Sequence, residues 1–255
     1  MITFSQEQII AWLSPLLWPF LRTLAIFTAT PILSSRAFPV RARVAISFLI
    51  AVAAQPSLEG MPIIDINGPE AAGAVVQQVG VGLAIGFCIR LVFTVFEVAG
   101  ELVGFQMGLN FASFFDPSMN SQTSAVARFF GQMATFMFIV TNGHLLLLLT
   151  VIQSFAVFPV DQHFLQAADQ MRIYRLGALL FSSALWIALP MIGVMLFTNL
   201  ALGFVSRVAP QMNIYAIGFP VTLTVGMVGI ASTLPMFDQP FHNLLMRALE
   251  IFAVG

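Results

Sequence analysis

Three charged residues in an otherwise apolar stretch could do chemistry. On a helix that turns about 100° per residue, Arg90, Glu97 and Glu101 fall within about 40° of one another. Charges at membrane depth are costly, and they normally face a bundle interior, a cavity or a partner. The group therefore predicts either an ion-coupling site or a contact with another helix. Two acids with one Arg suggest no obvious cycle of protonation, so we favour a partner helix.

Glycines share this face of the predicted helix. Gly100, Gly104 and Gly108 follow one another at four-residue spacing, and Gly104 and Gly108 fall beside the charges. Four-residue glycine spacing lets another helix approach closely. The alternative is an ordinary packed helix whose Arg and Glu side chains satisfy one another. We therefore predict helix packing and buried charge along this face.

Other residue types with possible chemistry are isolated. His144 precedes five leucines, so it is either a proton relay in a membrane helix or a neutral packing residue. His163 and His242 have no His, Cys or acidic partners at metal-ligand spacing apart from Asp161 and Asp238, and Cys88 has no second thiol. The chain has no zinc-protease signature, nucleophile elbow or phosphate loop. We expect no catalytic residue, no metal site and no cofactor.

Composition places the chain among membrane proteins. Of its 255 residues, 59% are hydrophobic and 8% are charged, whereas soluble domains carry about 25% charged residues. The mean hydropathy is +0.94. A net charge of -1 without a basic run argues against a nucleic-acid partner.

Six segments have roughly the length and apolar character of a spanning helix, which needs about 20 residues. The second of these segments, Val44–Leu58, is short, and the fifth, Leu176–Val205, carries Pro190, which should kink it. The sequence thus predicts an all-α integral membrane protein with about six hydrophobic helices in one domain, residues 1–255. The segments are Ile9–Leu33, Val44–Leu58, Gly73–Phe96, Phe129–Phe155, Leu176–Val205 and Ile214–Leu234.

The connections differ in charge. Ser34–Arg43 contains Arg36, Arg41 and Arg43, whereas Glu59–Glu70 contains three acids. Because cytoplasmic loops of membrane proteins are enriched in basic residues, we expect the first connection to face the cytoplasm.

An aromatic and polar segment follows the glycines. Phe111, Phe114 and Phe115 precede Asp116 and Pro117, and Asp before Pro marks a helix break. Irregular backbone at membrane depth persists only where protein buries it or where it lines a water-filled cavity. The segment therefore suits either a stopper inside a pore or a surface loop with an aromatic anchor.

The order of these features resembles the FliR family of flagellar biosynthetic proteins and its counterparts in virulence-type injectisomes. The resemblance covers nearly the whole chain, and its last part looks flagellar. The family often has Lys where this chain has Thr222. The matching residues are Arg22, Pro31, Pro39, Arg41 and Arg43; Ala99, Gly100, Glu101, Gly104, Gln106, Gly108, Asp116 and Pro117; Asn142, Gly143 and His144; Ser154, Phe155 and Pro159; and Arg207, Ala209, Pro210, Gln211, Met212, Asn213, Gly218, Phe219 and Pro220.

The resemblance implies a non-enzymatic subunit of a helical export gate that is built from helical hairpins. Its partners would be FliP, FliQ, FlhB, unfolded export substrates and membrane lipid, in the bacterial inner membrane at the flagellar basal body. The N-terminal part would be FliP-like and the C-terminal part FliQ-like. Phe111, Phe114, Phe115, Asp116 and Pro117 would belong to a plug in the closed channel.

A different class of protein remains as the alternative. In a self-contained secondary transporter, Arg90, Glu97 and Glu101 would form a coupling site near the midplane. We find no pair of matched halves with broken helices, and the chain is short for alternating access, so we favour the export gate.

Overall fold

The computed structural model describes residues 6–58, 64, 68–109, 123–161, 164–171, 173–211 and 213–253, and this part of the chain contains α- and 3-10 helices but no strand. The all-α prediction is confirmed to that extent. Contacts divide the chain into two compact units. Unit 1 comprises Met1–Leu91, Asn142–Leu176 and Leu245–Gly255, and unit 2 comprises Val92–Thr141 and Gly177–Leu244. The expected single domain, with FliP-like and FliQ-like parts, stays a prediction.

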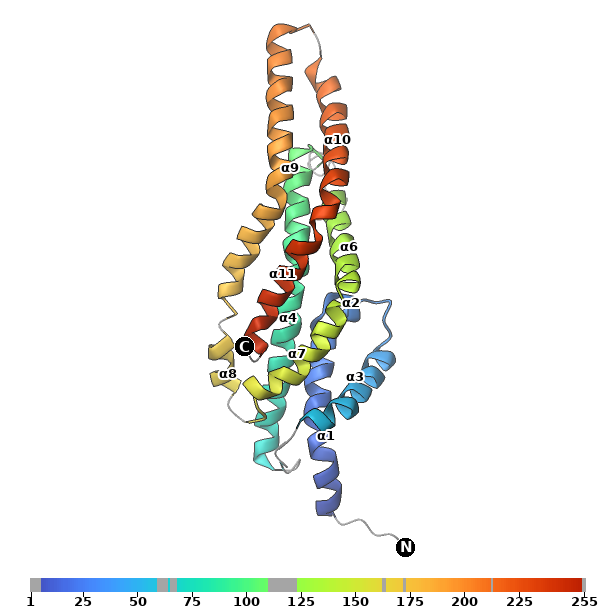
Figure 1. The fold of residues 1–255 in the computed structure, drawn as a ribbon, viewed down its shortest axis with the longest axis vertical. Helices are drawn as coiled ribbons and strands as arrows, with labels where there is room; N and C mark the ends of the chain where they lie inside the picture. The colour runs from blue at the N-terminus through green and yellow to red at the C-terminus, as the bar shows by residue number, and fades with distance from the viewer. Residues whose placement is uncertain are drawn as a thin grey trace. The chain divides into compact units, whose positions relative to one another are not determined.

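Unit 1 is built around the N-terminal helices. α1 packs along α3, and both also contact η1 (Figure 1). Pro31 starts α2 at its first position, where the missing N–H costs nothing, and α3 begins directly after Pro39. The elements are α1 (Gln6–Ala29), α2 (Pro31–Ser34), α3 (Val40–Ala54), η1 (Gln55–Ser57), the part of α4 (Pro69–Gln106) up to Leu91, α7 (Gly143–Val157), α8 (Phe164–Met171), the last residues of α11 (Asp238–Leu249) and η3 (Glu250–Phe252).

Unit 2 contains the end of α4, α6 (Ala125–Val140), α9 (Arg175–Val208) from Gly177, α10 (Ile214–Thr233), η2 (Leu234–Met236) and α11 up to Leu244. Its core is aromatic. Phe96 packs 5.8 Å from Phe237 and 5.5 Å from Phe241, measured between ring centroids, and Phe237 lies 5.1 Å from Phe130. These rings join α4, α6, the α10–α11 connection and α11, and each aromatic pair adds to the stabilisation from area burial.

α9 and α10 form a hairpin within unit 2 (Figure 1). A Cβ on Gly218 would lie 3.9 Å from Leu202, and one on Gly229 would lie 2.7 Å from the sulfur of Met191. The residue numbers fall along one helix as they rise along the other, so the two helices are antiparallel. A hairpin of apolar helices agrees with the predicted architecture.

Among the residues that the structure describes, three helices are long and apolar enough to cross a membrane: Pro69–Gln106, Leu176–Val208 and Ala216–Met236. They correspond to the predicted segments Gly73–Phe96, Leu176–Val205 and Ile214–Leu234. A fourth arises if α6 and α7 are counted as one broken span. α3 has 15 residues, fewer than the roughly 20 that a span needs. Six spanning helices are therefore not confirmed among the described residues.

The segment Phe129–Phe155, predicted as one helix, is interrupted in the structure. α6 ends at Val140 and α7 begins at Gly143. Asn142 between them has a φ of 56°, in the left-handed region that Asn tolerates better than most residues. The Asn-Gly pair is a turn signal that hydropathy does not register.

Candidate functional site

The predicted plug residues Phe111, Phe114, Phe115, Asp116 and Pro117 lie outside the described residues, so the plug stays a prediction. The residues that flank this segment are described, and both ends are held within unit 2. The segment is therefore connected to a defined part of the fold at each end.

At the α4 end, Met107 is completely buried. Its side chain fills the space beside Gly226 of α10, where a Cβ would lie 2.6 Å from the methionine Cγ. The hydroxyl of Thr222 donates a hydrogen bond of 3.2 Å to the Met107 carbonyl. Gly108 follows with a φ of 78°, which favours glycine. α10 thus fixes the point where α4 ends.

At the α6 end, Glu101 of α4 accepts a hydrogen bond of 3.1 Å from the backbone N–H of Ser124. The Ser124 hydroxyl in turn accepts from the N–H of Ala127 and caps α6. A carboxylate beside a helix N-terminus is also favoured by the helix dipole. Glu101 therefore ties the start of α6 to α4.

Gly100 is closely packed on the predicted packing face. A Cβ on Gly100 would lie 2.7 Å from the Cα of Ala127, so α6 approaches α4 closely at this position. Gly104 is buried and Gly108 is half-buried. Glu97 lies over Gly131 of α6, where a Cβ would be 3.1 Å from its carboxylate oxygen.

The predicted charged group is only partly covered by this chain. Arg90 and Glu97 are exposed and Glu101 is half-buried. All three make interactions within the chain. Their predicted burial against a partner helix stays a prediction, as does a direct contact between Arg90 and the two acids.

The isolated His and Cys residues differ in exposure. His144 is exposed on the first turn of α7, and Cys88 is completely buried in α4. Among the described residues, no group of three His, Cys, Asp or Glu side chains is placed to hold a metal ion.

The most elaborate polar site in unit 1 surrounds Arg22, which is completely buried. Its guanidinium donates to Gln78 Oε1 at 2.9 Å, to Ser154 Oγ at 2.9 Å and to the Phe158 carbonyl at 2.7 Å. The ring of Phe155 lies 3.6 Å from the guanidinium carbon. One side chain of α1 thus joins α4, α7 and the segment after α7. Rigid, planar donor geometry makes Arg suited to such a position.

The Arg22 site continues through two glutamines. Gln78 donates to Gln77 Oε1 at 2.6 Å, and Gln77 donates to Asp161 and to the Pro159 carbonyl. The N–H of Asp161 donates back to Gln77 Oε1. Because these groups satisfy one another, the polar atoms are buried at low cost.

A second glycine pair brings α1 and α4 together beside Arg22. A Cβ on Gly82 would lie 2.5 Å from the Arg22 carbonyl oxygen, and one on Gly86 would lie 2.5 Å from the Cβ of Ala29. The contacts advance in the same direction along both helices, so α1 and α4 are parallel. Sequence reasoning missed this contact, although Gly82 and Gly86 have the same four-residue spacing as Gly100 and Gly104.

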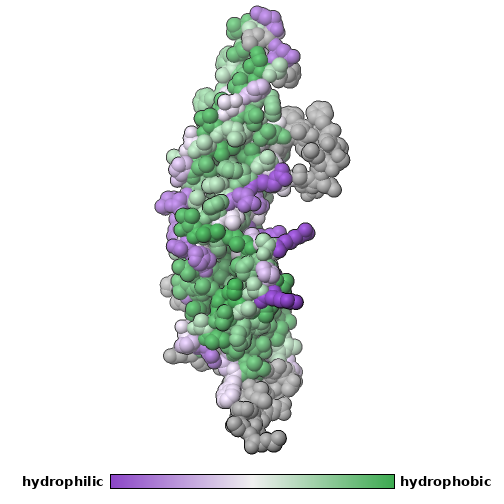
Figure 2. Space-filling model, turned by 90° about the vertical axis from the view of Figure 1, so that its right-hand side faces the viewer, coloured by the Kyte–Doolittle hydropathy of each residue, from purple (hydrophilic) through white to green (hydrophobic). Residues whose placement is uncertain are grey.

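The α9–α10 hairpin has the largest uncovered apolar surface of the candidate spans. The chain buries 61% of the apolar window in α4, 28% of that in α9 and 11% of that in α10. The upper part of Figure 2 shows hydrophobic residues over most of the visible hairpin surface. On α9, Leu189, Phe197, Leu200 and Phe204 are exposed and follow helical spacing with Gly193, where a Cβ would meet nothing within 4 Å. Such a face suits either lipid or another helix.

Comparison with known proteins gives matches over nearly the whole chain. The family described as "Bacterial export proteins, family 1" matches residues 13–248. The chain is 37% identical to the flagellar biosynthetic protein FliR of Escherichia coli K12 and 34% identical to that of Pectobacterium carotovorum, covering 99% of this chain and 97% of each relative. It is 28% identical to FliR of Bacillus subtilis, covering 91% of this chain and 90% of the relative.

Proposed function

The chain belongs to family 1 of the bacterial export proteins, and we propose that it is a non-enzymatic subunit of the flagellar type III protein export gate. The observation that carries this proposal is the near full-length similarity to proteins named flagellar biosynthetic protein FliR. A component of the flagellar export apparatus with helices of spanning length is a membrane protein. We place it in the inner membrane, at the flagellar basal body.

In this proposal the chain forms channel wall and plug together with FliP and FliQ, next to FlhB, and unfolded flagellar substrates pass through the channel. The uncovered α9–α10 hairpin supports a role in assembly, because a helix of another subunit can bury its apolar face. Gly193 supports it further, since a Cβ there would meet nothing within 4 Å in this chain. The transporter alternative gains no support from the comparisons or from the described residues.

Co-purification tests the assembly. Tagged chain expressed with FliP and FliQ should recover both proteins, and Gly193→Leu should reduce that recovery because the larger side chain blocks a close helix approach. Gly203→Leu is the matched control, because Gly203 also has open space on α9 but lies about 80° from Gly193 around the helix, outside the face of Leu189, Phe197 and Phe204, so it should reduce recovery less. The lone Gly193→Leu chain should unfold at the same temperature as wild type. Recovery of neither FliP nor FliQ with the unaltered chain would exclude the proposed assembly.

The plug is tested separately. Replacing Phe111, Phe114 and Phe115 with Ser should leave the complex assembled but make resting cells leak small ions, because hydrophobic constrictions exclude ions by dewetting. The measurement is membrane conductance, with growth in the presence of small toxic solutes as a second readout. If the variant assembles and conducts no more ions than wild type, these phenylalanines are not the seal, and the barrier lies in another subunit.

A further inference from the structure

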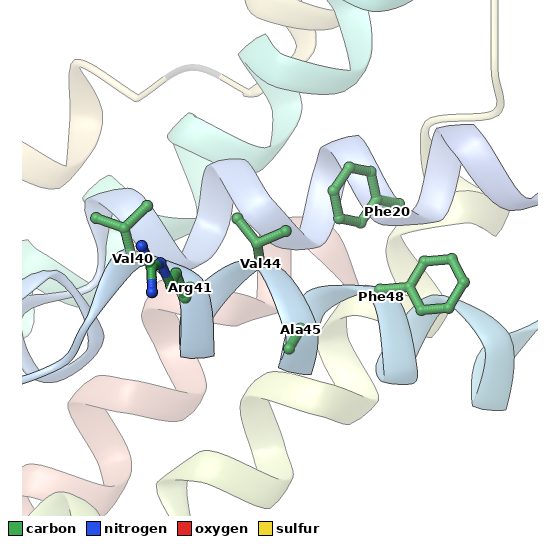
Figure 3. A pocket seen from close by; sticks show the side chains of 6 residues that line it. All are labelled: Phe20, Val40, Arg41, Val44, Ala45 and Phe48. Atoms are coloured by element: carbon green, nitrogen blue, oxygen red, sulfur yellow. The ribbon is translucent and has the colours of Figure 1, made fainter.

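An open groove lies between α1 and α3 in unit 1, with a volume of about 470 Å³. Its lining is apolar except for one guanidinium. Figure 3 shows Val40 and Arg41 at one end of the groove and the rings of Phe20 and Phe48 at the other. The two rings meet edge to face, 6.4 Å apart. The lining residues are Phe20 from α1 and Val40, Arg41, Val44, Ala45 and Phe48 from α3.

The charged end of the groove belongs to a basic segment. Residues 31–54 contain three Arg and no acid. Arg41 and Arg36 are exposed, and the Arg41 side chain has no hydrogen bond or ion pair with another described residue. Within it, Ser34–Arg43 is the connection that the distribution of basic residues predicts to face the cytoplasm. The cytoplasmic leaflet carries anionic lipids, whose surface potential attracts Arg.

We propose that this groove binds an anionic phospholipid, with an acyl chain along Val44 and Phe48 and the headgroup phosphate at Arg41. An acyl chain with a phosphate at one end matches an apolar groove with a cation at one end. Arg pairs with phosphate through parallel N–H donors, and its stem packs on apolar surface. The proposal requires that the chain lies in a membrane, and it does not depend on a role in protein export.

A helix of another protein is the competing occupant of the groove. It would have to leave Arg41 exposed or bring an acid to it, whereas a phospholipid supplies both the apolar and the anionic part in one molecule. The charge at one end of the apolar lining therefore favours the lipid. A crosslinking experiment separates the two occupants.

Lipid binding is measured by native mass spectrometry of the full chain in neutral detergent, titrated with phosphatidylglycerol or with phosphatidylcholine. Phosphatidylglycerol should bind more tightly. Arg41→Gln should weaken its binding about fivefold, since a basic residue near an anionic membrane surface contributes about 1 kcal/mol. Arg36→Gln is the matched control, because Arg36 is exposed outside the groove, and it should change binding less.

Ala45→Trp fills the groove and should abolish the binding of both lipids. Its control is Ile46→Trp, because Ile46 lies on the same helix, is exposed and does not line the groove. Phosphatidylglycerol binding that is unchanged by both Arg41→Gln and Ala45→Trp would overturn the proposal.

A photoreactive benzophenone side chain in place of Val44 reports the occupant in cells. Attachment of a phospholipid mass to the chain supports the proposal. Attachment of another protein without any lipid adduct overturns it and assigns the groove to a partner helix. Assembly with FliP and FliQ is scored in the same cells, so failure of the lipid site is distinguishable from failure of the export-gate assignment.

Discussion

Arg22 offers the sharpest test of what holds unit 1 together. Arg22→Met keeps a long, flexible side chain but removes the donors that serve Gln78, Ser154 and the Phe158 carbonyl. A buried acceptor left without a donor costs about 1–3 kcal/mol, so three acceptors amount to roughly 3–9 kcal/mol. The loss of the stacking on Phe155 adds on the order of 1 kcal/mol.

One term opposes these losses. Burying the guanidinium costs several kcal/mol in the folded protein, and Arg22→Met removes that cost. We therefore expect a net destabilisation of about 3–5 kcal/mol, which is the loss from the three acceptors and the stacking less this desolvation cost. For a protein of this size, about 2–4 °C per kcal/mol predicts that the midpoint of thermal unfolding falls by on the order of 10 °C.

The assay is thermal unfolding of the full chain in mild detergent, with Arg36→Met as the control at an exposed Arg. Arg22→Lys should also be strongly destabilising, because a compact ammonium lacks the fork of donors that reaches all three acceptors. In a double-mutant cycle, Gln78→Leu should cost less in the Arg22→Met background than alone, with a coupling of about 1–3 kcal/mol. If Arg22→Met and Arg36→Met unfold at the same temperature, the reasoning is refuted.

Three further substitutions test other contacts by thermal unfolding of the full chain. Gly82→Ala should destabilise by on the order of 1–3 kcal/mol through overpacking, whereas Gly203→Ala should be neutral or stabilising by up to about 1 kcal/mol; equal effects would show that α1 and α4 adapt. Thr222→Val should cost about 1 kcal/mol by removing the donor that the Met107 carbonyl shares with the Phe219 carbonyl, and Thr224→Val, whose hydroxyl is exposed, should cost less. Glu101→Ala should cost about 1 kcal/mol because it removes the acceptor at the start of α6, and Glu101→Gln should retain most of the stability. The same result for Ala and Gln would show that the charge, and not the hydrogen bond, matters.

Hydropathy predicted the long helices because each of them is a long run of apolar residues, and hydropathy records local composition. The predicted segment Leu176–Val205 falls within α9, and Ile214–Leu234 ends one residue beyond α10. Hydropathy did not predict the break between α6 and α7 at Asn142, since one left-handed residue hardly changes the mean hydropathy of a window. Spans predicted from hydropathy therefore need a separate search for turn signals.

The polar site of unit 1 was not predictable from local sequence. The acceptors of Arg22 lie 56, 132 and 136 residues away along the chain. In the sequence, Arg22 stood out only through the family resemblance, which assigns it no partner. Gly82 and Gly86 were predictable in principle, because their spacing is visible, but the partner helix is not encoded in that spacing.

The polar groups of the α9–α10 hairpin bear on what covers its apolar surface. Hydroxyl groups along both helices donate to carbonyls of their own helix, so lipid or an apolar partner can cover these positions without leaving a donor unpaired. The hydroxyls thus do not distinguish lipid from protein. The Gly193→Leu substitution does, because lipid accommodates an added side chain, whereas a closely packed helix does not. The hydroxyl residues are Ser182, Thr198, Ser206, Thr224 and Ser232.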